Sequence, residues 1–316
     1  MQASLPTYVS GLIGAPWVNA GAMTNKGVEF TLNTRNILTH DFTWTSGLTF
    51  SINRNEVTKL YSESSAISGI NGNETLTYTM VGEPVGQFYG YKVIGMFKEE
   101  SDFYKKDADG NFQLDEAGNR IRIAIPKGQQ ISKNGIWVGD YIYEDLHEDG
   151  VIDEKDRTFL GNPAPKFTFG FNNYFAYKGF DLNIFLNGSV GNKAVNLIRR
   201  TFTDPMRNSN LLKEATDIAL IGMHDPEVGD EELSNVYIVN ADRAKVQRVT
   251  TSSANDNNRI SSRFIEDASY LRIKNISLGY TFPRKWLRHL QIDNIRLYVN
   301  IQNLCTISGY KGYDLK

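Results

Sequence analysis

The chain has 316 residues, enough for one large domain or two ordinary ones. Its formal net charge of −2 and its pI near 6.1 lack the basic excess that is typical of a nucleic-acid-binding protein. The single cysteine, Cys305, excludes an internal disulfide and a thiolate zinc cluster, and the alternating residues around it predict a packed side chain.

The N-terminal segment MQASLPTYVSGLIGAPW lacks the basic start and apolar run of a signal peptide. No stretch of the chain approaches the roughly 18 consecutive apolar residues of a membrane-spanning helix. Six later segments alternate apolar and polar residues, which predicts strands with one apolar and one polar face. They cover residues 27–34, 42–53, 166–177, 179–189, 269–282 and 294–304.

Short and very long connections alternate between these segments. The pairs of segments are joined by RNILTHD, by a turn at Tyr177-Lys178-Gly179 and by PRKWLRHLQID, whereas about residues 54–165 and 188–268 separate one pair from the next. Connections longer than ~15 residues are uncommon in compact domains, but bacterial outer-membrane barrels combine short turns on one side with long loops on the other. We therefore expect extracellular loops at about 54–165 and 188–268, with the strand-like segment 86–97 inside the first.

An alternation of apolar and polar residues with a period of two fits two architectures: an antiparallel transmembrane β-barrel and a soluble β-sandwich. Aromatic residues beside the short turns, such as Tyr177, Phe180 and Trp286, occur in both. Within 269–282 the apolar phase changes between Ile273 and Ile276, which predicts a β-bulge. In a barrel, the side chains expected to face lipid are Phe42, Trp44, Phe50, Phe167, Phe169, Phe171, Leu182, Ile184, Leu297, Val299 and Ile301.

An acidic loop, DLHEDGVIDEKD, directly precedes the third segment and follows the calcium-loop pattern D-x-[DN]-x-[DN]-G. Calcium prefers several oxygen ligands, and Gly150 stands where the pattern needs a sharp turn. The expected ligands at positions 1, 3, 5, 7, 9 and 12 are Asp145, His147, Asp149, the Val151 carbonyl, Asp153 and Asp156. His147 offers nitrogen where oxygen is usual, and a solvated acidic turn is the alternative. We expect a structural Ca²⁺ here.

The motifs of common enzyme classes are absent from the sequence. There is no G-x-S-x-G, H-E-x-x-H, P-loop or dinucleotide-binding motif, and the four histidines are scattered. A carboxylate pair for glycoside hydrolysis needs no local motif, so the sequence does not exclude it. Asp109-Gly110 and Ala117-Gly118 are predicted to form the tips of small hairpins without a metal. We predict neither catalytic residues nor enzymatic activity.

Five longer motifs together resemble the SusC/RagA-type TonB-linked outer-membrane transporters, a class of TonB-dependent receptor. They are NKGVEFTL, GEPVGQFYGYKVIGMF, GDYIYEDLHEDGVIDEKDRTFLGNPAPKFTFGFN, EDASYLRIKNISLGYTFP and RLYVNIQNLCTISGYKGYD, in order from about residue 16 to the last residue. The loop of the family usually reads close to D-x-N-x-D-G, so His147 departs from it at the third position.

The resemblance implies an all-β fold, the C-terminal part of a 22-stranded plugged barrel with about six spanning strands in residues 1–316. It also implies TonB-dependent import of oligosaccharides or peptides across the outer membrane of a Gram-negative bacterium. The implied partners are a SusD-like surface lipoprotein, the TonB–ExbB–ExbD complex, a glycan or peptide substrate and outer-membrane lipid, but no nucleic acid. The plug domain, signal peptide and closing strand are not found, so we expect a fragment that is inactive alone. The alternative is a secreted, calcium-stabilised β-sandwich that binds carbohydrate.

Overall fold

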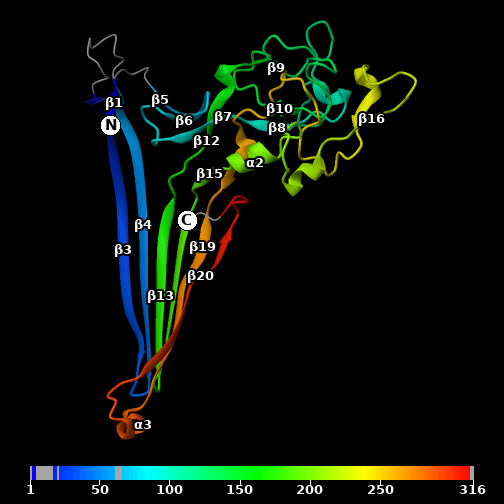
Figure 1. Cartoon of the computed structure of the whole chain (residues 1–316). Coiled ribbons are helices and arrows are strands. Elements are labelled where there is room, and N and C mark those ends of the chain that lie inside the picture. The colour runs from blue at the N-terminus through cyan, green and yellow to red at the C-terminus, as the bar shows by residue number, and fades with distance from the viewer. Residues whose placement is uncertain (1, 5–16, 20, 61–65, 314–316) are drawn as a thin grey trace.

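The computed structural model describes residues 2–4, 17–19, 21–60 and 66–313. One half is a long antiparallel sheet of six strands, and the other is a loop-rich domain at one end of this sheet (Figure 1). The strand order is β20-β19-β14-β13-β4-β3, so consecutive long strands are neighbours. The strands are β3 (Gly21–Leu38), β4 (Phe42–Leu60), β13 (Phe167–Tyr177), β14 (Phe180–Val190), β19 (Tyr270–Thr281) and β20 (Arg296–Ser308). The six predicted strands are confirmed.

Three short connections lie at the end of the sheet far from the loop domain (Figure 1). Between β13 and β14 the turn consists of Lys178 and Gly179, whose φ angles of 44° and 93° are both positive, as tight hairpins with the sheet's twist require. The connection between β19 and β20 contains α3 (Arg284–Leu287) and η6 (Arg288–Leu290). The predicted bulge in β19 is confirmed, because the pairing with β14 and β20 skips Lys274.

The register places apolar residues of all six strands on one face of the sheet. One row across the strands consists of Leu32, Leu48, Phe171, Leu186, Ile273 and Cys305. The next row, on the opposite face, consists of Thr31, Thr49, Gly170, Asn187, Arg272 and Thr306. Each strand therefore contributes to one apolar and one polar face, as the alternation predicts.

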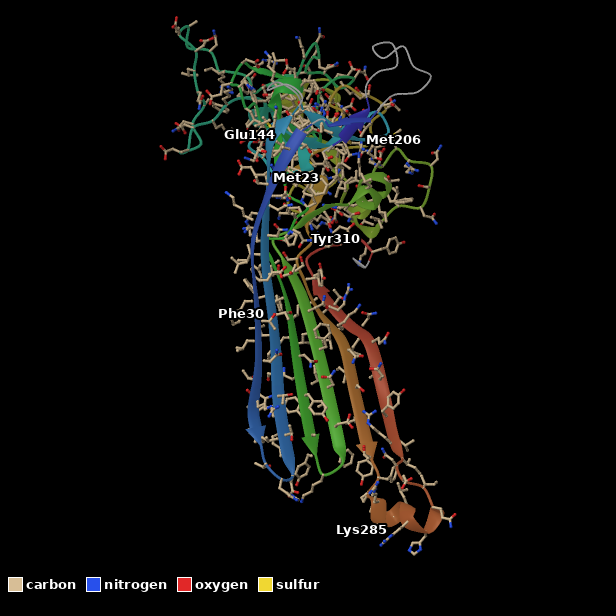
Figure 2. The ribbon with its side chains drawn as sticks, turned by 90° about the vertical axis from the view of Figure 1, so that its left-hand side faces the viewer. Met23, Phe30, Glu144, Met206, Lys285 and Tyr310 are labelled. Atoms are coloured by element: carbon tan, nitrogen blue, oxygen red, sulfur yellow. The ribbon has the colours of Figure 1, made fainter. Side chains whose placement is uncertain are left out.

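The apolar face has no second sheet over it within the described part of the chain. Val28 is 65% exposed, Leu297 63% and Val299 65%, and the side chain of Phe30 projects outward from β3 (Figure 2). A β-sandwich would bury this face against another layer. The sandwich alternative therefore does not describe this fold.

Cys305 corrects one expectation. Its side chain is exposed rather than packed, because β20 is the last strand of the sheet and has a neighbour on one side only. The alternation correctly gives its face, but it says nothing about whether that face is covered. No helix in the described residues is long and apolar enough to cross a membrane.

The described residues of the two long excursions, 66–166 and 191–269, fold together into the loop domain. Its core contains Phe97 and Phe103, which stack with ring centroids 4.1 Å apart, and Val236 and Ile238 from the second excursion. The segment 86–97 forms β7 and β8 in this domain rather than a strand of the long sheet, as predicted. Reverse turns at Gly110 and Gly118 confirm the two hairpin tips.

The loop domain and the N-terminal segment contain many short elements. They are β1 (Gln2–Ser4), β2 (Trp17–Asn19), β5 (Ile67–Asn71), β6 (Glu74–Thr79), β7 (Gln87–Tyr91), β8 (Val93–Met96), η1 (Glu100–Phe103), β9 (Ile125–Pro126), β10 (Tyr141–Tyr143), β11 (Val151–Ile152), η2 (Glu154–Asp156), β12 (Arg157–Gly161), β15 (Lys193–Val195), α2 (Leu197–Phe202), η3 (Lys213–Asp217), β16 (Ile221–Met223), η4 (Leu233–Asn235), β17 (Val236–Ile238), η5 (Ser262–Phe264) and β18 (Ile265–Asp267). Most of them pair in twos, as β8 with β10 and β15 with β18, and one sheet has four strands in the order β12-β7-β6-β5.

Candidate functional site

The acidic loop lies between β10 and β12, where the first excursion approaches the long sheet. Its carboxylates accept hydrogen bonds from the loop's own backbone. Asp145 Oδ2 accepts from Gly150 N–H at 2.9 Å, and Asp149 Oδ1 accepts from Val151 N–H at 3.1 Å. Gly150 has φ of +81°, which explains why glycine stands at this position. The loop is thus closed locally by its acidic side chains.

Asp156 is the most buried of the predicted ligands, with 1% of its surface exposed. Its two oxygens accept from Leu146 N–H at 3.0 Å and Asp153 N–H at 2.8 Å, while His147 Nδ1 lies 3.7 Å from Oδ1. Asp153 in turn caps η2 by accepting from Lys155 N–H. Asp156 therefore joins the two ends of the twelve-residue segment.

Asp145 carries a feature that backbone capping does not explain. Its Oδ1 atom is buried and has no hydrogen-bond partner within the described residues. A buried carboxylate oxygen without a donor or a cation is costly. In this conformation no three His, Cys, Asp or Glu side chains of the described residues converge closely enough to hold a metal ion. The carboxylate oxygens of the loop suit a hard cation. To coordinate one, these side chains would have to break their hydrogen bonds to the backbone of the loop.

A buried ion pair connects the two excursions and was not predicted from the sequence. Asp140 and Arg248 have side chains only 1% and 5% exposed, and two hydrogen bonds of 3.0 and 3.1 Å join them. Asp140 also accepts from Trp137 N–H and Asn257 Nδ2, both at 2.8 Å. Arg248 donates to the carbonyls of Lys133 and Gly135. The pair is thus a buried contact between the two excursions in which both charged groups have hydrogen-bond partners.

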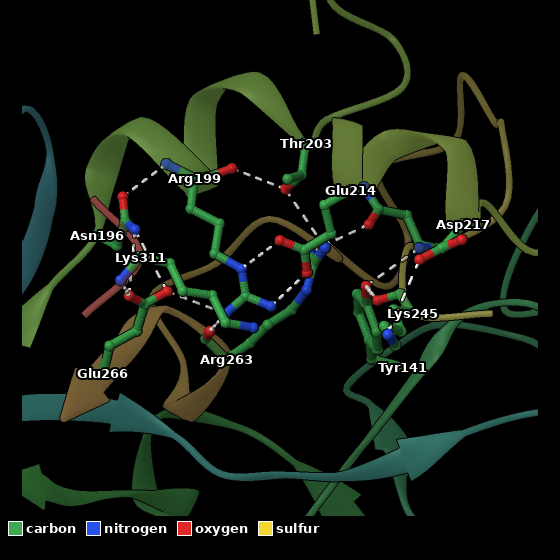
Figure 3. Close-up of polar contacts among 11 residues, drawn as sticks. Tyr141, Asn196, Arg199, Thr203, Glu214, Asp217, Lys245, Arg263, Glu266 and Lys311 are labelled. Atoms are coloured by element: carbon green, nitrogen blue, oxygen red, sulfur yellow. Dashed lines mark hydrogen bonds and ion pairs between the residues drawn. The ribbon is translucent and has the colours of Figure 1, made fainter. Parts of the chain in front are cut away.

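A second polar network ties the second excursion to the top of the long sheet (Figure 3). Arg199 on α2 forms a bidentate pair with Glu214 on η3. It also donates to the Arg263 carbonyl at 2.6 Å and to Glu266 at 3.3 Å. Glu266 accepts from Lys311 N–H, just beyond β20, at 2.8 Å. The network thus joins α2, η3, β18 and the end of β20.

The contacts between Arg199 and Glu214 favour the charged forms of both residues. The hydrogen bonds from Arg199 lower the pKa of Glu214, against the opposing effect of burial, and the Glu214 carboxylate raises the pKa of Arg199. Arg263 stacks over the ring of Tyr141, 4.6 Å from its centroid, and burial lowers its pKa. The opposite shifts of Glu214 and Arg199 are those of a structural ion pair, in which each charged group favours the charged form of the other.

The aromatic residues of the first excursion pack the domain. Trp137 and Tyr91 are 2% and 8% exposed, and burial raises the pKa of Tyr91 to about 12. Tyr89 stacks on Tyr78 with ring centroids 4.6 Å apart. Such rings resemble sugar-stacking platforms in sequence, but here their faces contact protein. Trp137 and Tyr91 therefore belong to the core of the domain, and Tyr89 packs against Tyr78.

Among the hollows of the described residues, two illustrate where hydrogen-bonding groups gather. A groove of about 420 Å³ on the polar face of the long sheet is lined by Asn33, Thr45, Thr49 and Asn172, among others. A smaller pocket of about 160 Å³ in the loop domain is lined by residues such as Gln247, Ser252 and Asn258. Both surfaces offer donors and acceptors suited to a polar ligand.

No family model matches the chain. The TonB-dependent receptor P3 of Formosa agariphila is 32% identical over 314 residues, 98% of this chain and 26% of the relative. The TonB-dependent receptor SusC of Bacteroides thetaiotaomicron is 25% identical over 94% of this chain and 24% of its own length. The chain is similar along nearly its whole length to TonB-dependent receptors, SusC among them. It spans about a quarter of the length of these curated relatives.

Solved structures support the same fold. The RagAB peptide transporter superposes with a TM-score of 0.68 at 22% identity, covering 98% of this chain and 28% of that chain. The RagAB peptide importer in an open state gives a TM-score of 0.63 at 21% identity, covering 99% and 28%. The six-stranded sheet therefore shares the fold of one part of these transporter chains, as expected for part of a β-barrel. The relatives are receptors and transporters, in agreement with the prediction that the chain is not an enzyme.

Proposed function

We propose that this chain forms part of the barrel wall of an outer-membrane transporter that imports oligosaccharides or peptides in a Gram-negative bacterium. The observation that carries the proposal is the sheet with one continuous, uncovered apolar face and one polar face. Lipid has no hydrogen-bonding groups, so a spanning sheet must turn apolar side chains outward and pair its backbone within the sheet. The polar groove then faces the lumen.

The proposed orientation follows from the connections. Short turns of outer-membrane barrels face the periplasm, and long loops face outside. The loop domain, built from residues 66–166 and 191–269, would then meet the substrate and a SusD-like lipoprotein. The energy would come from the TonB–ExbB–ExbD complex through parts of the receptor outside this chain. The related SusC and the RagAB transporter support these assignments by their family.

Uptake by whole cells tests the import proposal. In a strain that carries a complete receptor with this sequence, we expect uptake of either labelled oligosaccharides or labelled peptides, lost when TonB is removed. Cells without the receptor but with intact TonB are the matched control. Unchanged uptake of both substrate classes in those cells would contradict the proposal, as would a protein that is monomeric in buffer without detergent.

We also propose that the acidic loop binds a structural Ca²⁺ through Asp145, His147, Asp149, the Val151 carbonyl, Asp153 and Asp156. The buried, unpartnered Oδ1 of Asp145 supports this, because a cation would supply the missing partner. The ion would hold the point where the first excursion returns to the sheet. It would supply charge neutralisation only, and no reaction step depends on it.

Calcium should raise the thermal stability of the loop domain. With free Ca²⁺ at ten to a hundred times its dissociation constant, linkage gives about 1.4–2.7 kcal/mol, which a chelator should remove. The double substitution Asp145→Ala/Asp149→Ala should abolish this difference. Asp107→Ala/Asp115→Ala, at the two small hairpins, is the matched control and should keep it. A wild-type melting temperature indifferent to chelator would refute the site.

A further inference from the structure

The end of the sheet opposite the loop domain carries an uncompensated basic surface. Lys178 lies in the turn between β13 and β14, and Arg284, Lys285 and Arg288 lie in the connection between β19 and β20. We call these four residues the basic rim. All four are exposed, and Lys285 projects from the far end of the molecule (Figure 2).

Carboxylates do not neutralise the basic rim. Within the described residues no ion pair joins any of its four side chains to an Asp or Glu. Three carboxylates lie near this end: the Asp41 carboxylate contacts the His40 ring at 2.8 Å, and Asp181 is paired with Arg296. Asp293 is exposed and forms no ion pair in the described part of the chain. The rim therefore keeps a positive excess facing solvent.

The basic rim is continuous with the apolar face through a row of aromatic rings. Phe180 contacts Tyr280 with centroids 4.4 Å apart, Tyr280 contacts Phe282 at 5.1 Å, and Phe282 contacts Trp286 at 6.3 Å. Trp286 is 61% exposed, whereas Leu287 is buried and anchors α3. Trp at the boundary of an apolar face marks the depth of lipid headgroups. Arg284, Lys285 and Arg288 are thus placed at that depth.

We propose that the basic rim binds the phosphate headgroups of anionic phospholipids in the periplasmic leaflet. The proposal rests on the membrane orientation given above. Charge complementarity and continuity with the lipid-facing surface identify the occupant, because a Lys or Arg near an anionic membrane surface gains about 1 kcal/mol, or roughly fivefold in affinity. Lys178 also lies 5.3 Å from the ring of Tyr177, which directs its ammonium group along the same belt.

Native mass spectrometry of the complete receptor in detergent micelles tests this inference. The probes are phosphatidylglycerol and phosphatidylcholine with identical acyl chains. Wild-type protein should retain phosphatidylglycerol preferentially, and Arg284→Gln/Lys285→Gln/Arg288→Gln should reduce this preference by about tenfold to a hundredfold. Lys178 stays unchanged, because its φ of 44° makes the turn sensitive to substitution.

The control variant Lys127→Gln/Lys213→Gln/Arg243→Gln removes the same charge from exposed positions of the loop domain. It should keep the preference for phosphatidylglycerol. The inference is overturned if both variants lose the preference equally, or if the rim variant keeps it. If the wild-type receptor requires detergent but retains both lipids equally, lipid binding by the basic rim is rejected and the proposed membrane function is not. A wild type that is monomeric without detergent would reject the membrane function as well.

Discussion

Replacing Asp140 with Ala should destabilise the loop domain by about 3–5 kcal/mol, the usual cost of breaking a buried ion pair. The substitution leaves Arg248 charged, 5% exposed and without its carboxylate partner. It also removes the acceptor for Trp137 N–H and Asn257 Nδ2. Thermal unfolding and hydrogen exchange of residues 130–141 and 246–258 measure the effect. Because the pair joins both excursions, exchange should increase in both segments.

The matched control for Asp140 is Asp230, which pairs with Lys133 at 2.8 Å. Both side chains of that pair are nearly half exposed, so Asp230→Ala should cost about 0–1 kcal/mol. Similar small losses for the two variants would show that the Asp140–Arg248 pair does not hold the excursions together. Arg248→Met should behave like Asp140→Ala, since it leaves the buried carboxylate without its cation.

Phe171→Arg should prevent normal insertion of the barrel, at a cost of about 2–4 kcal/mol near the bilayer midplane. Phe171 lies in the middle of β13 and is paired with Leu48 and Leu186 on the apolar face. The fraction of folded receptor in the outer membrane, read from heat-dependent gel mobility, measures this effect. A guanidinium at this position faces hydrocarbon without an acceptor.

The adjacent residue supplies the control for Phe171. Asn172 points to the polar face and lines the groove of about 420 Å³, so Asn172→Arg has room and access to water. It should leave folding close to that of the wild type. If Asn172→Arg were the more damaging of the two, the assignment of lipid and lumen faces would be reversed. Equal, small effects would contradict a membrane wall altogether.

The strands and their faces follow from the sequence because a period of two is a local property. The predicted bounds 27–34 and 42–53 are nevertheless shorter than β3 and β4, which have 18 and 19 residues. Their added ends mix polar and apolar residues without alternation, and Lys26 is paired directly with Arg54. Backbone hydrogen bonds continue there without an apolar pattern, so alternation underestimates the strands. The bulge at Lys274 was predictable from the sequence because it shifts the alternation of apolar and polar residues.

The polar interior of the loop domain was not predictable in the same way. Asp140 and Arg248 are 108 residues apart, and Arg199 and Glu266 are 67 apart. No local sequence spacing predicts such pairs, because the partners come into contact only when both excursions fold. The acidic loop is the opposite case, because its residues are contiguous and its pattern is readable. Its geometry supports a closed loop, and its occupancy by Ca²⁺ stays a prediction.

The two-residue turn at Lys178 and Gly179 has a consequence for the order of assembly. It brings β13 and β14 together at almost no loop-closure cost, so this hairpin can zip early. Pairing of β4 with β13, by contrast, joins residues such as Trp44 and Phe175 across the whole first excursion. This pairing of β4 with β13 is the slower step, because it closes the first excursion into a long loop. Condensation of the loop domain, which shortens the free chain between β4 and β13, lowers the entropy cost of that pairing.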